Sequence, residues 1–157
     1  MMASVFDRIV ALLEEHDVGF VHVRHAPVRT SEQAAEARGE PLEIGGKALV
    51  IKVDGEFALF VLSAAARLDN RALKRHFSAK NMRFASPDEL MTLTGLVPGS
   101  VPPFGRPVLP LPLYVDSSAL DNQRIAFNAG SLKDSLVIAT SDYRLVAQPE
   151  VFRFHKR

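Results

Sequence analysis

The most constraining feature of this sequence is the segment formed by residues 95–105, which reads GLVPGSVPPFG. Its three glycines and three prolines exclude a regular helix or strand, because proline fixes φ and removes a backbone N–H. The segment is also too apolar to be an idle solvent-exposed linker. A loop stiffened in this way can hold backbone amides, such as those of Gly99 and Ser100, ready to receive a carbonyl oxygen or an oxyanion. Two interpretations stay open, a binding loop and an apolar connector between two elements.

The bulk properties favour a globular protein. The 157 residues fit a single domain, 1–157, that is long enough to bury a substantial core, and 47% of them are hydrophobic. No apolar run is long enough to span a membrane, and acidic residues interrupt the apolar stretch that a signal peptide would need near the start. The absence of cysteine excludes disulfides and thiolate chemistry and fits a reducing compartment. We therefore expect a cytoplasmic protein without a membrane partner.

Short helices and strands alternate along the chain, as judged from periodicity, capping residues and turn signals. We expect helices over residues 4–16, 32–38, 69–77, 87–94, 116–120 and 141–146. We expect strands over residues 20–24, 47–53, 56–62, 82–85, 108–115, 124–127, 135–139 and 151–154. Because strands outnumber helices and are mostly joined by turns, the prediction is an α+β domain around a mixed, partly closed β-sheet flanked by short helices.

Two strand predictions carry more detail. Asp54-Gly55 is a favoured two-residue turn, so residues 47–53 and 56–62 should form a hairpin. Both arms are nearly continuous apolar runs, which indicates a central position covered on both faces. The prolines at positions 110 and 112 should confine the strand 108–115 to a sheet edge, since proline cannot donate to the ladder.

The helix expected over residues 69–77 has a basic face. Arg67, Arg71, Lys74 and Arg75 fall on one side of a helical wheel. Such a face is either simply solvated or turned towards the phosphates of a nucleic acid. The net charge of the chain is only +1, so any contact with nucleic acid must come from a local patch of this kind, and binding to DNA is not expected.

Familiar catalytic patterns are missing. There is no GxSxG elbow, no Walker loop and no GxGxxG motif after a strand. The histidines are scattered, without an HxH or HExxH pattern, at positions 16, 22, 25, 76 and 155. The sequence therefore predicts neither a metal site nor a cofactor.

Lys47 is the remaining candidate for chemistry. It opens an otherwise apolar strand directly after Gly45-Gly46, which would place its ammonium group near the mouth of the sheet. The alternative is a strand-end lysine whose aliphatic stem covers apolar surface. The turn at 128–131, with the sequence NAGS, offers further polar groups through Asn128 and Ser131.

At this point the sequence resembles a known family, the YbaK-type aminoacyl-tRNA deacylases, also called prolyl-tRNA synthetase-associated editing domains. The resembling features run in the family's order. A strand leads to His25 and to a Thr-Ser helix start at 30–31, and Lys47 opens the central strand within GKAL. A GxxPG motif at 95–99 is followed by PFG, and FNAGS at 127–131 precedes a strand and an SDY helix. The resemblance covers nearly the whole chain.

The resemblance implies a barrel-like α/β fold and hydrolysis of the ester that joins a wrong, small amino acid to tRNA. Aminoacylated tRNA, from the proline system among others, would be the substrate, and an aminoacyl-tRNA synthetase is a candidate partner. Lys47 would take the part of the essential lysine. The candidate substrate-binding residues are Gly95, Pro98, Gly99, Ser100, Asn128, Gly130, Ser131 and His25, and the candidate tRNA contacts are the four basic residues of the 69–77 helix and its approach.

Two departures bear on specificity. Ala48 follows the lysine where alanine-specific relatives tend to carry asparagine, and Phe20 stands where some members have tyrosine.

An aminoacyl ester is already activated, so an enzyme that positions a water molecule and stabilises an oxyanion can hydrolyse it without a covalent nucleophile. A non-catalytic module that binds a nucleotide, an amino acid or a protein is the alternative interpretation, and a hydrolase for another small ester is a third.

Overall fold

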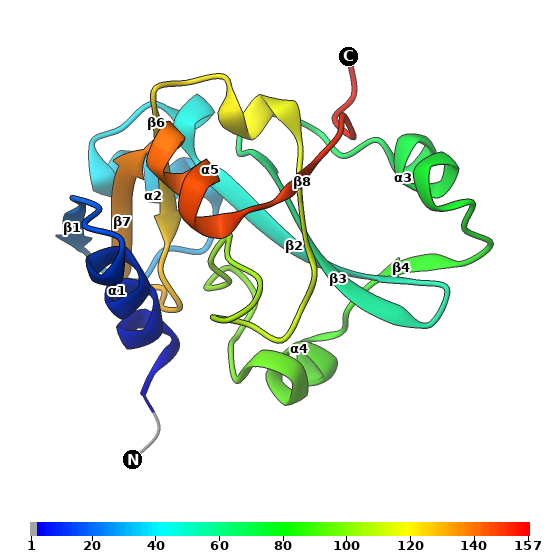
Figure 1. The fold of residues 1–157 in the computed structure, drawn as a ribbon, viewed down its shortest axis with the longest axis horizontal. Helices are drawn as coiled ribbons and strands as arrows, with labels where there is room; N and C mark the ends of the chain where they lie inside the picture. The colour runs from blue at the N-terminus through cyan, green and yellow to red at the C-terminus, as the bar shows by residue number, and fades with distance from the viewer. Residues whose placement is uncertain (1–2) are drawn as a thin grey trace.

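The structure is a computed structural model that describes residues 3–157 (Figure 1). None of its helices is long and apolar enough to cross a membrane. In chain order the elements are α1 (Val5–Glu15), β1 (Val21–Arg24), α2 (Ser31–Arg38), the 3-10 helix η1 (Leu42–Ile44), β2 (Gly46–Val53), β3 (Glu56–Ser63), α3 (Asn70–Phe77), β4 (Met82–Phe84), α4 (Pro87–Thr94), β5 (Leu113–Val115), the 3-10 helix η2 (Ser117–Leu120), β6 (Arg124–Asn128), β7 (Asp134–Ala139), α5 (Thr140–Ala147) and β8 (Glu150–Val151).

The strands form two sheets. One has the order β1-β7-β6 and the other the order β4-β2-β3-β5-β8. The predicted α+β class is confirmed, and the strands combine parallel and antiparallel pairs. The sheets are not closed into a barrel, because within residues 3–157 the backbone pairing between them is one parallel bridge, between Gly45 and Ala126. On either side of that bridge, β6 continues along β7 and β2 continues along β3.

The predicted hairpin is confirmed as the centre of the larger sheet. β2 and β3 pair from Gly46 opposite Ser63 to Val53 opposite Glu56. The turn residues Asp54 and Gly55 both have positive φ, as a tight two-residue hairpin turn requires. Alternate side chains of a strand point to opposite faces. In β3 they accordingly enter two separate hydrophobic cores, Leu59 and Val61 the larger one and Phe60 and Leu62 the other.

Most helices begin at the residues that the sequence indicates. Each N-cap side chain accepts a hydrogen bond from a backbone N–H of the first turn. The caps are Ser4 for α1, Thr30 for α2, Asp69 for α3 and Ser86 for α4, the last in a full capping box with Glu89. These caps fix the residues at which the four helices begin.

The strand predicted over residues 108–115 is wrong in extent and in position. Only Leu113–Val115 forms a strand, and it lies between β3 and β8 rather than at an edge. The prolines precede the paired residues, so they do not remove donors from the ladder. The carbonyl of Pro112 even accepts a hydrogen bond from Leu59 N–H at 2.9 Å.

The last strand is also shorter than predicted. β8 consists of Glu150–Val151 instead of residues 151–154. The backbone N–H groups of Phe154 and His155 donate to the carboxylate of the buried Asp116 rather than to a neighbouring strand. The carboxylate of Asp116 thus takes the place of a strand carbonyl as the acceptor for these two N–H groups.

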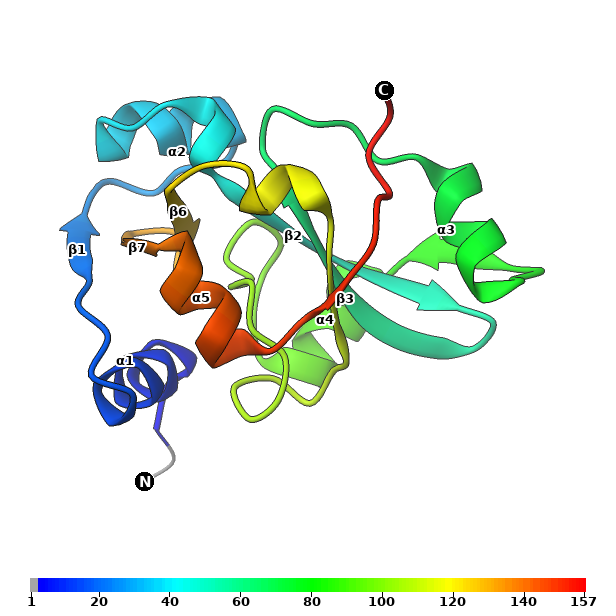
Figure 2. The same ribbon diagram turned by 45° about the horizontal axis from the view of Figure 1, so that its top comes forward.

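The segment 95–105 is tied into the core. In Figures 1 and 2 it lies between the two sheets. Phe104 is 1% exposed and meets Phe127 and Tyr143 edge to face, at 5.4 Å between ring centroids in each case. The hydroxyl of Tyr143, in α5, donates to the carbonyl of Pro103 at 2.6 Å. Packing and one buried hydrogen bond therefore hold the loop.

We predict that Tyr143→Phe destabilises the protein by about 1–3 kcal/mol, because it leaves the buried carbonyl of Pro103 without its donor. Urea unfolding of the two proteins measures this difference. Tyr114→Phe removes a hydroxyl from a partly exposed ring and should cost clearly less. Equal stability of Tyr143→Phe and the parent protein would contradict the anchoring role of this hydrogen bond.

Candidate active site

A cavity of about 230 Å³ lies where the start of β2 meets α2 and the end of β6. It is lined by residues from five separate parts of the chain. They are Val28, Arg29, Thr30, Ser31, Ala34 and Arg38 in and before α2, Gly45 to Leu49 at the start of β2 with Ala64 beside it, Gly99 and Val101 in the Pro/Gly loop, and Asn128 at the end of β6.

Two glycines set the position of Lys47. A Cβ atom on Gly45 would lie 2.9 Å from Cβ of Ala64, and one on Gly46 would lie 2.9 Å from Cδ1 of Ile125. Any side chain at these positions would therefore push the backbone away from its neighbours. Because both glycines lack side chains, β2 begins in close contact with Ala64 at the end of β3 and with Ile125 in β6. This places Lys47 in the lining of the cavity.

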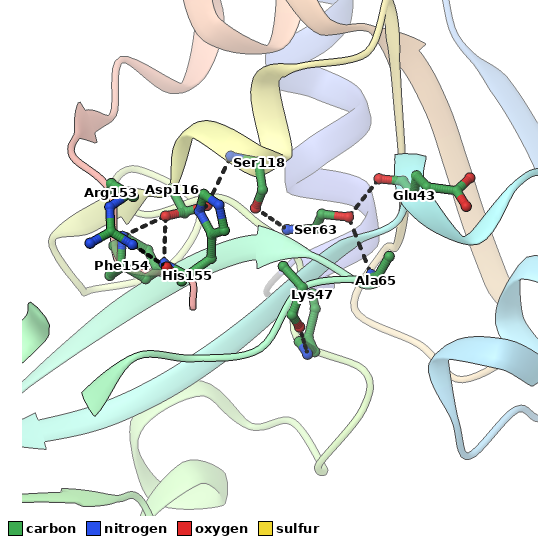
Figure 3. A network of polar contacts seen from close by, with 10 residues as sticks. Glu43, Lys47, Ser63, Ala65, Asp116, Ser118, Arg153, Phe154 and His155 are labelled. Atoms are coloured by element: carbon green, nitrogen blue, oxygen red, sulfur yellow. Dashed lines mark hydrogen bonds and ion pairs between the residues drawn. The ribbon is translucent and has the colours of Figure 1, made fainter. Parts of the chain in front are cut away.

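Lys47 is half-buried, and its ammonium group donates to the carbonyl of Ala66 at 3.0 Å (Figure 3). Burial lowers the pKa of Lys47 because it removes water from the charged form, and the carboxylate of Glu32 partly opposes this shift. A poorly solvated ammonium interacts more strongly with an anion than a fully hydrated one does. This lysine is therefore suited to stabilising negative charge that develops in the cavity.

A chain of hydrogen bonds links α2 to the Pro/Gly loop. The guanidinium of Arg38 donates through Nε to Oγ of Ser135 at 2.8 Å and through Nη2 to Oδ1 of Asn128 at 2.9 Å. Nδ2 of Asn128 then donates to the carbonyl of Gly99 at 2.7 Å. His25 joins the chain, with Nε2 at 2.8 Å from Oγ of Ser135. These bonds tie α2 to the end of β6 and to the Pro/Gly loop, three parts of the chain that line the cavity.

Arg38 brings a second positive charge to the cavity. Burial lowers its pKa to about 10, and the carboxylate of Glu40 opposes the shift. It therefore stays charged at neutral pH. Among residues 3–157 no carboxylate lines this cavity, so the charges of Arg38 and Lys47 are not neutralised within it.

The structure brings together three of the predicted site residues, Lys47, Gly99 and Asn128. Other residues of the Pro/Gly loop have backbone roles. Gly95 ends α4 in a left-handed conformation, and Pro98 lies at the exposed tip. Ser100 is buried, and both its N–H and its hydroxyl bond to the carbonyl of Val97, so its amide does not face the cavity as an oxyanion donor.

The predicted residues of the second loop lie behind the cavity wall. Gly130 has φ of 77° and sits so close to α1 that a Cβ atom would lie 2.8 Å from Cγ1 of Val5. Ser131 accepts a hydrogen bond from the N–H of Lys133. His25 does not line the cavity, and Ser135 links it to the lining residue Arg38. These residues support the lining without belonging to it.

The basic residues Arg67, Arg71, Lys74 and Arg75 are exposed in or just before α3, and none lines the cavity. The structure therefore separates them from Lys47, although Arg67 directly follows Ala66, which binds the lysine.

Sequence reasoning missed Arg38, Thr30 and Ser31 as cavity residues. Each has an ordinary local explanation. Thr30 caps α2, Ser31 opens it, and a cation in the last turn, such as Arg38, complements the helix dipole. The partner that marks Arg38 as special, Asn128, lies 90 residues further along the chain. No local pattern carries that information.

We predict that Glu32→Gln lowers the pKa of Lys47 further, because it removes the one charge that favours the ammonium form. Titration of the lysine side chain by NMR measures this shift. Glu36→Gln, which removes another exposed carboxylate of α2, is the matched control and should leave Lys47 unchanged. A pKa that rises or stays constant in Glu32→Gln would show that this carboxylate does not act on Lys47.

The chain is similar to several known proteins over most of its length. The chain is 38% identical to the "Multifunctional Ser/Thr-tRNA deacylase ProXp-y" of Escherichia coli K12, over 95% of this chain and 92% of that one. It is 33% identical to the proline–tRNA ligase of Shouchella clausii, where 83% of this chain corresponds to only 25% of the ligase. A crystal structure of a proposed trans-editing enzyme for prolyl tRNA synthetase superposes with a TM-score of 0.81, at 25% identity and over 100% of both chains.

The sequence profile described as "Aminoacyl-tRNA editing domain" matches residues 25–145. This range contains every residue that lines the cavity. The chain belongs to the aminoacyl-tRNA editing domain family.

Proposed function

We propose that this protein is a trans-editing hydrolase that removes a wrongly attached amino acid from tRNA. The observation that carries the proposal is the meeting of Lys47, Gly99 and Asn128 at one cavity, from three distant parts of the chain. The E. coli relative named as a Ser/Thr-tRNA deacylase matches nearly the whole chain, which supports the same activity here.

The proposed reaction is hydrolysis of the ester between the amino acid and the terminal ribose. Water attacks the ester carbonyl, the C–O bond to the ribose breaks, and the products are a free amino acid and uncharged tRNA. The tetrahedral intermediate carries an oxyanion, which the ammonium of Lys47 would stabilise in the partly desolvated cavity. Because the ester is already activated, the chain needs no covalent nucleophile. The free hydroxyl of the terminal ribose can help to activate the water.

The cavity also suggests which amino acids are removed. It is small, and the side chains of Thr30, Ser31 and Arg38 give it a polar wall. Small polar side chains fit such a wall, because a buried donor or acceptor is costly unless it finds a partner. Serine and threonine, which the name of the E. coli relative gives as its substrates, are therefore the amino acids we propose.

The remaining expectations extend the proposal. We assign the activity to a single editing domain, 1–157, that works in the cytoplasm on tRNA of the proline system, with prolyl-tRNA synthetase as the candidate partner. The acceptor stem would contact the basic face of α3, whose cations are Arg67, Arg71, Lys74 and Arg75. Exposed cations of this kind provide sequence-independent attraction for phosphate.

We predict that the protein deacylates seryl- and threonyl-tRNA and that Lys47→Ala lowers kcat/KM by roughly 100- to 1000-fold, the usual cost of removing one oxyanion donor. A panel of tRNAs charged with Ser, Thr, Ala or Cys tests both statements. Lys47→Arg keeps the charge and should retain more activity than Lys47→Ala. Binding of charged tRNA without turnover would favour a non-catalytic module, and full activity of Lys47→Ala would remove the lysine from the mechanism.

We predict that Arg38→Lys lowers kcat/KM for seryl-tRNA at least about tenfold, although the charge is kept. Lysine cannot donate to Ser135 and Asn128 through one planar group, and a hydrogen bond of a charged group is worth about 1.5–3 kcal/mol. Steady-state kinetics measures the loss, and thermal unfolding checks that the variant is folded. Arg124→Lys, at an exposed ion pair with Glu40, is the matched control and should keep full activity. Unchanged kinetics of Arg38→Lys would mean that this network does not organise the cavity.

A further inference from the structure

A second cleft lies on the other side of the segment 63–67. Its volume is about 630 Å³, and it is built from the end of β3, η1, the end of η2 and the C-terminal residues. Ala64 lines the catalytic cavity, whereas Ser63, Ala65, Ala66 and Arg67 line this cleft. The two hollows are therefore separated by one short stretch of backbone.

The charges of the cleft are divided between its two ends. The backbones of Arg67 and Lys156 are joined, since the N–H of Lys156 donates to the carbonyl of Arg67 at 2.8 Å, and Arg157 follows Lys156 in the lining of the cleft. Glu43 and Asp121 line the other end, where Nδ2 of Asn122 reaches the carbonyl of Glu43 at 3.4 Å. One end of the cleft is thus cationic and the other acidic.

A buried carboxylate holds the cleft in shape. Asp116 is fully buried and accepts hydrogen bonds from the N–H groups of Ser118 at 2.8 Å and of His155 at 2.9 Å (Figure 3). Nδ1 of His155 lies 2.7 Å from its second oxygen, Oδ2. Oγ of Ser118 in turn accepts from the N–H of Ser63 at 3.0 Å. Asp116 therefore ties η2, the C-terminal residues and the end of β3 to one another.

The cationic end is next to the catalytic lysine. Lys47 donates to the carbonyl of Ala66, and Arg67 is the following residue. A single-stranded RNA end that enters the catalytic cavity carries one phosphate with each nucleotide. Arg67 and Lys156 are exposed cations that lie outside the cavity, next to the segment that binds Lys47. Their backbones belong to the segments that the hydrogen bonds around Asp116 hold in place. Cations on such a frame can bind phosphate with little loss of entropy.

We propose that the cationic end of this cleft binds backbone phosphates of the single-stranded 3′ end of the tRNA, directly upstream of the aminoacylated nucleotide. This inference rests on the proposed function. Lys156 and Arg157 supply phosphate contacts that are separate from the basic face of α3. The carboxylates of Glu43 and Asp121 repel phosphate, so the strand runs along the Arg67 side of the cleft.

The test compares Lys156→Gln/Arg157→Gln with Lys80→Gln/Arg106→Gln, a double variant with the same change of net charge at exposed sites outside both hollows. The probes are two uncharged acceptor-stem RNA hairpins, one with a four-nucleotide single-stranded 3′ end and one blunt. We expect the cleft variant to bind the first hairpin at least about tenfold more weakly than the parent protein and the second equally well. Its salt dependence with the first hairpin should flatten by about 1.4 in log K against log salt, for two single-strand contacts.

Each other outcome overturns the inference. An equal loss in both double variants would point to net charge alone, and an equal loss on both hairpins would place the contact on the stem. Unchanged binding of the cleft variant would leave the cleft without this role. Because these measurements need no turnover, they stand even if the parent protein hydrolyses no charged tRNA, which would refute the proposed function instead.

Discussion

The site depends on the close approach of backbones at Gly45 and Gly46. At this point the two sheets touch through the bridge between Gly45 and Ala126, and no space is left for a Cβ atom on either glycine. The approach sets the start of β2, and the start of β2 sets the position of Lys47. A Cβ atom on Gly46 would press on Ile125 of the other sheet, and one on Gly45 would press on Ala64 at the end of β3. The position of Lys47 at the cavity is thus a consequence of backbone packing.

Electrostatics acts within this frame. Lys47 is held by a carbonyl oxygen, and Arg38 is held by an amide and a hydroxyl. Neutral partners fix the direction of a cation without cancelling its charge, so both groups remain free to attract an anion. The cost is desolvation, which lowers the pKa of each. Sites of this kind give up some stability for function, because a partly buried cation that donates hydrogen bonds only to neutral groups is unfavourable until an anion binds.

Local signals in the sequence predicted what depends on local interactions. The helix start at residues 30–31, the helix over 87–94 and the Asp54-Gly55 turn depend on contacts within a few residues, and the structure confirms all three. Residues 108–112 and 152–154 are apolar enough to predict strands. Whether they pair as strands depends on groups far away in the sequence, such as Asp116, which binds the N–H group of Phe154. Arg38 shows the same limit at the site, because its role follows from Asn128 across the fold. The activity was predicted from the resemblance to a family, not from local patterns. The structure was needed to distinguish Gly99, which lines the cavity, from Gly130, which packs on α1.

The segment 63–67 connects these observations. Its beginning is fixed by β3 and by the bond from Ser63 N–H to Ser118, and its end by the bond from Lys156 to the carbonyl of Arg67. Between these fixed points the carbonyl of Ala66 receives Lys47. The lysine is therefore positioned from two sides, by the glycines at its own strand and by the segment 63–67, which Asp116 secures through Ser118. A protein that must place one ammonium group against an ester, while holding the attached RNA chain, gains accuracy when both tasks share one rigid stretch of backbone.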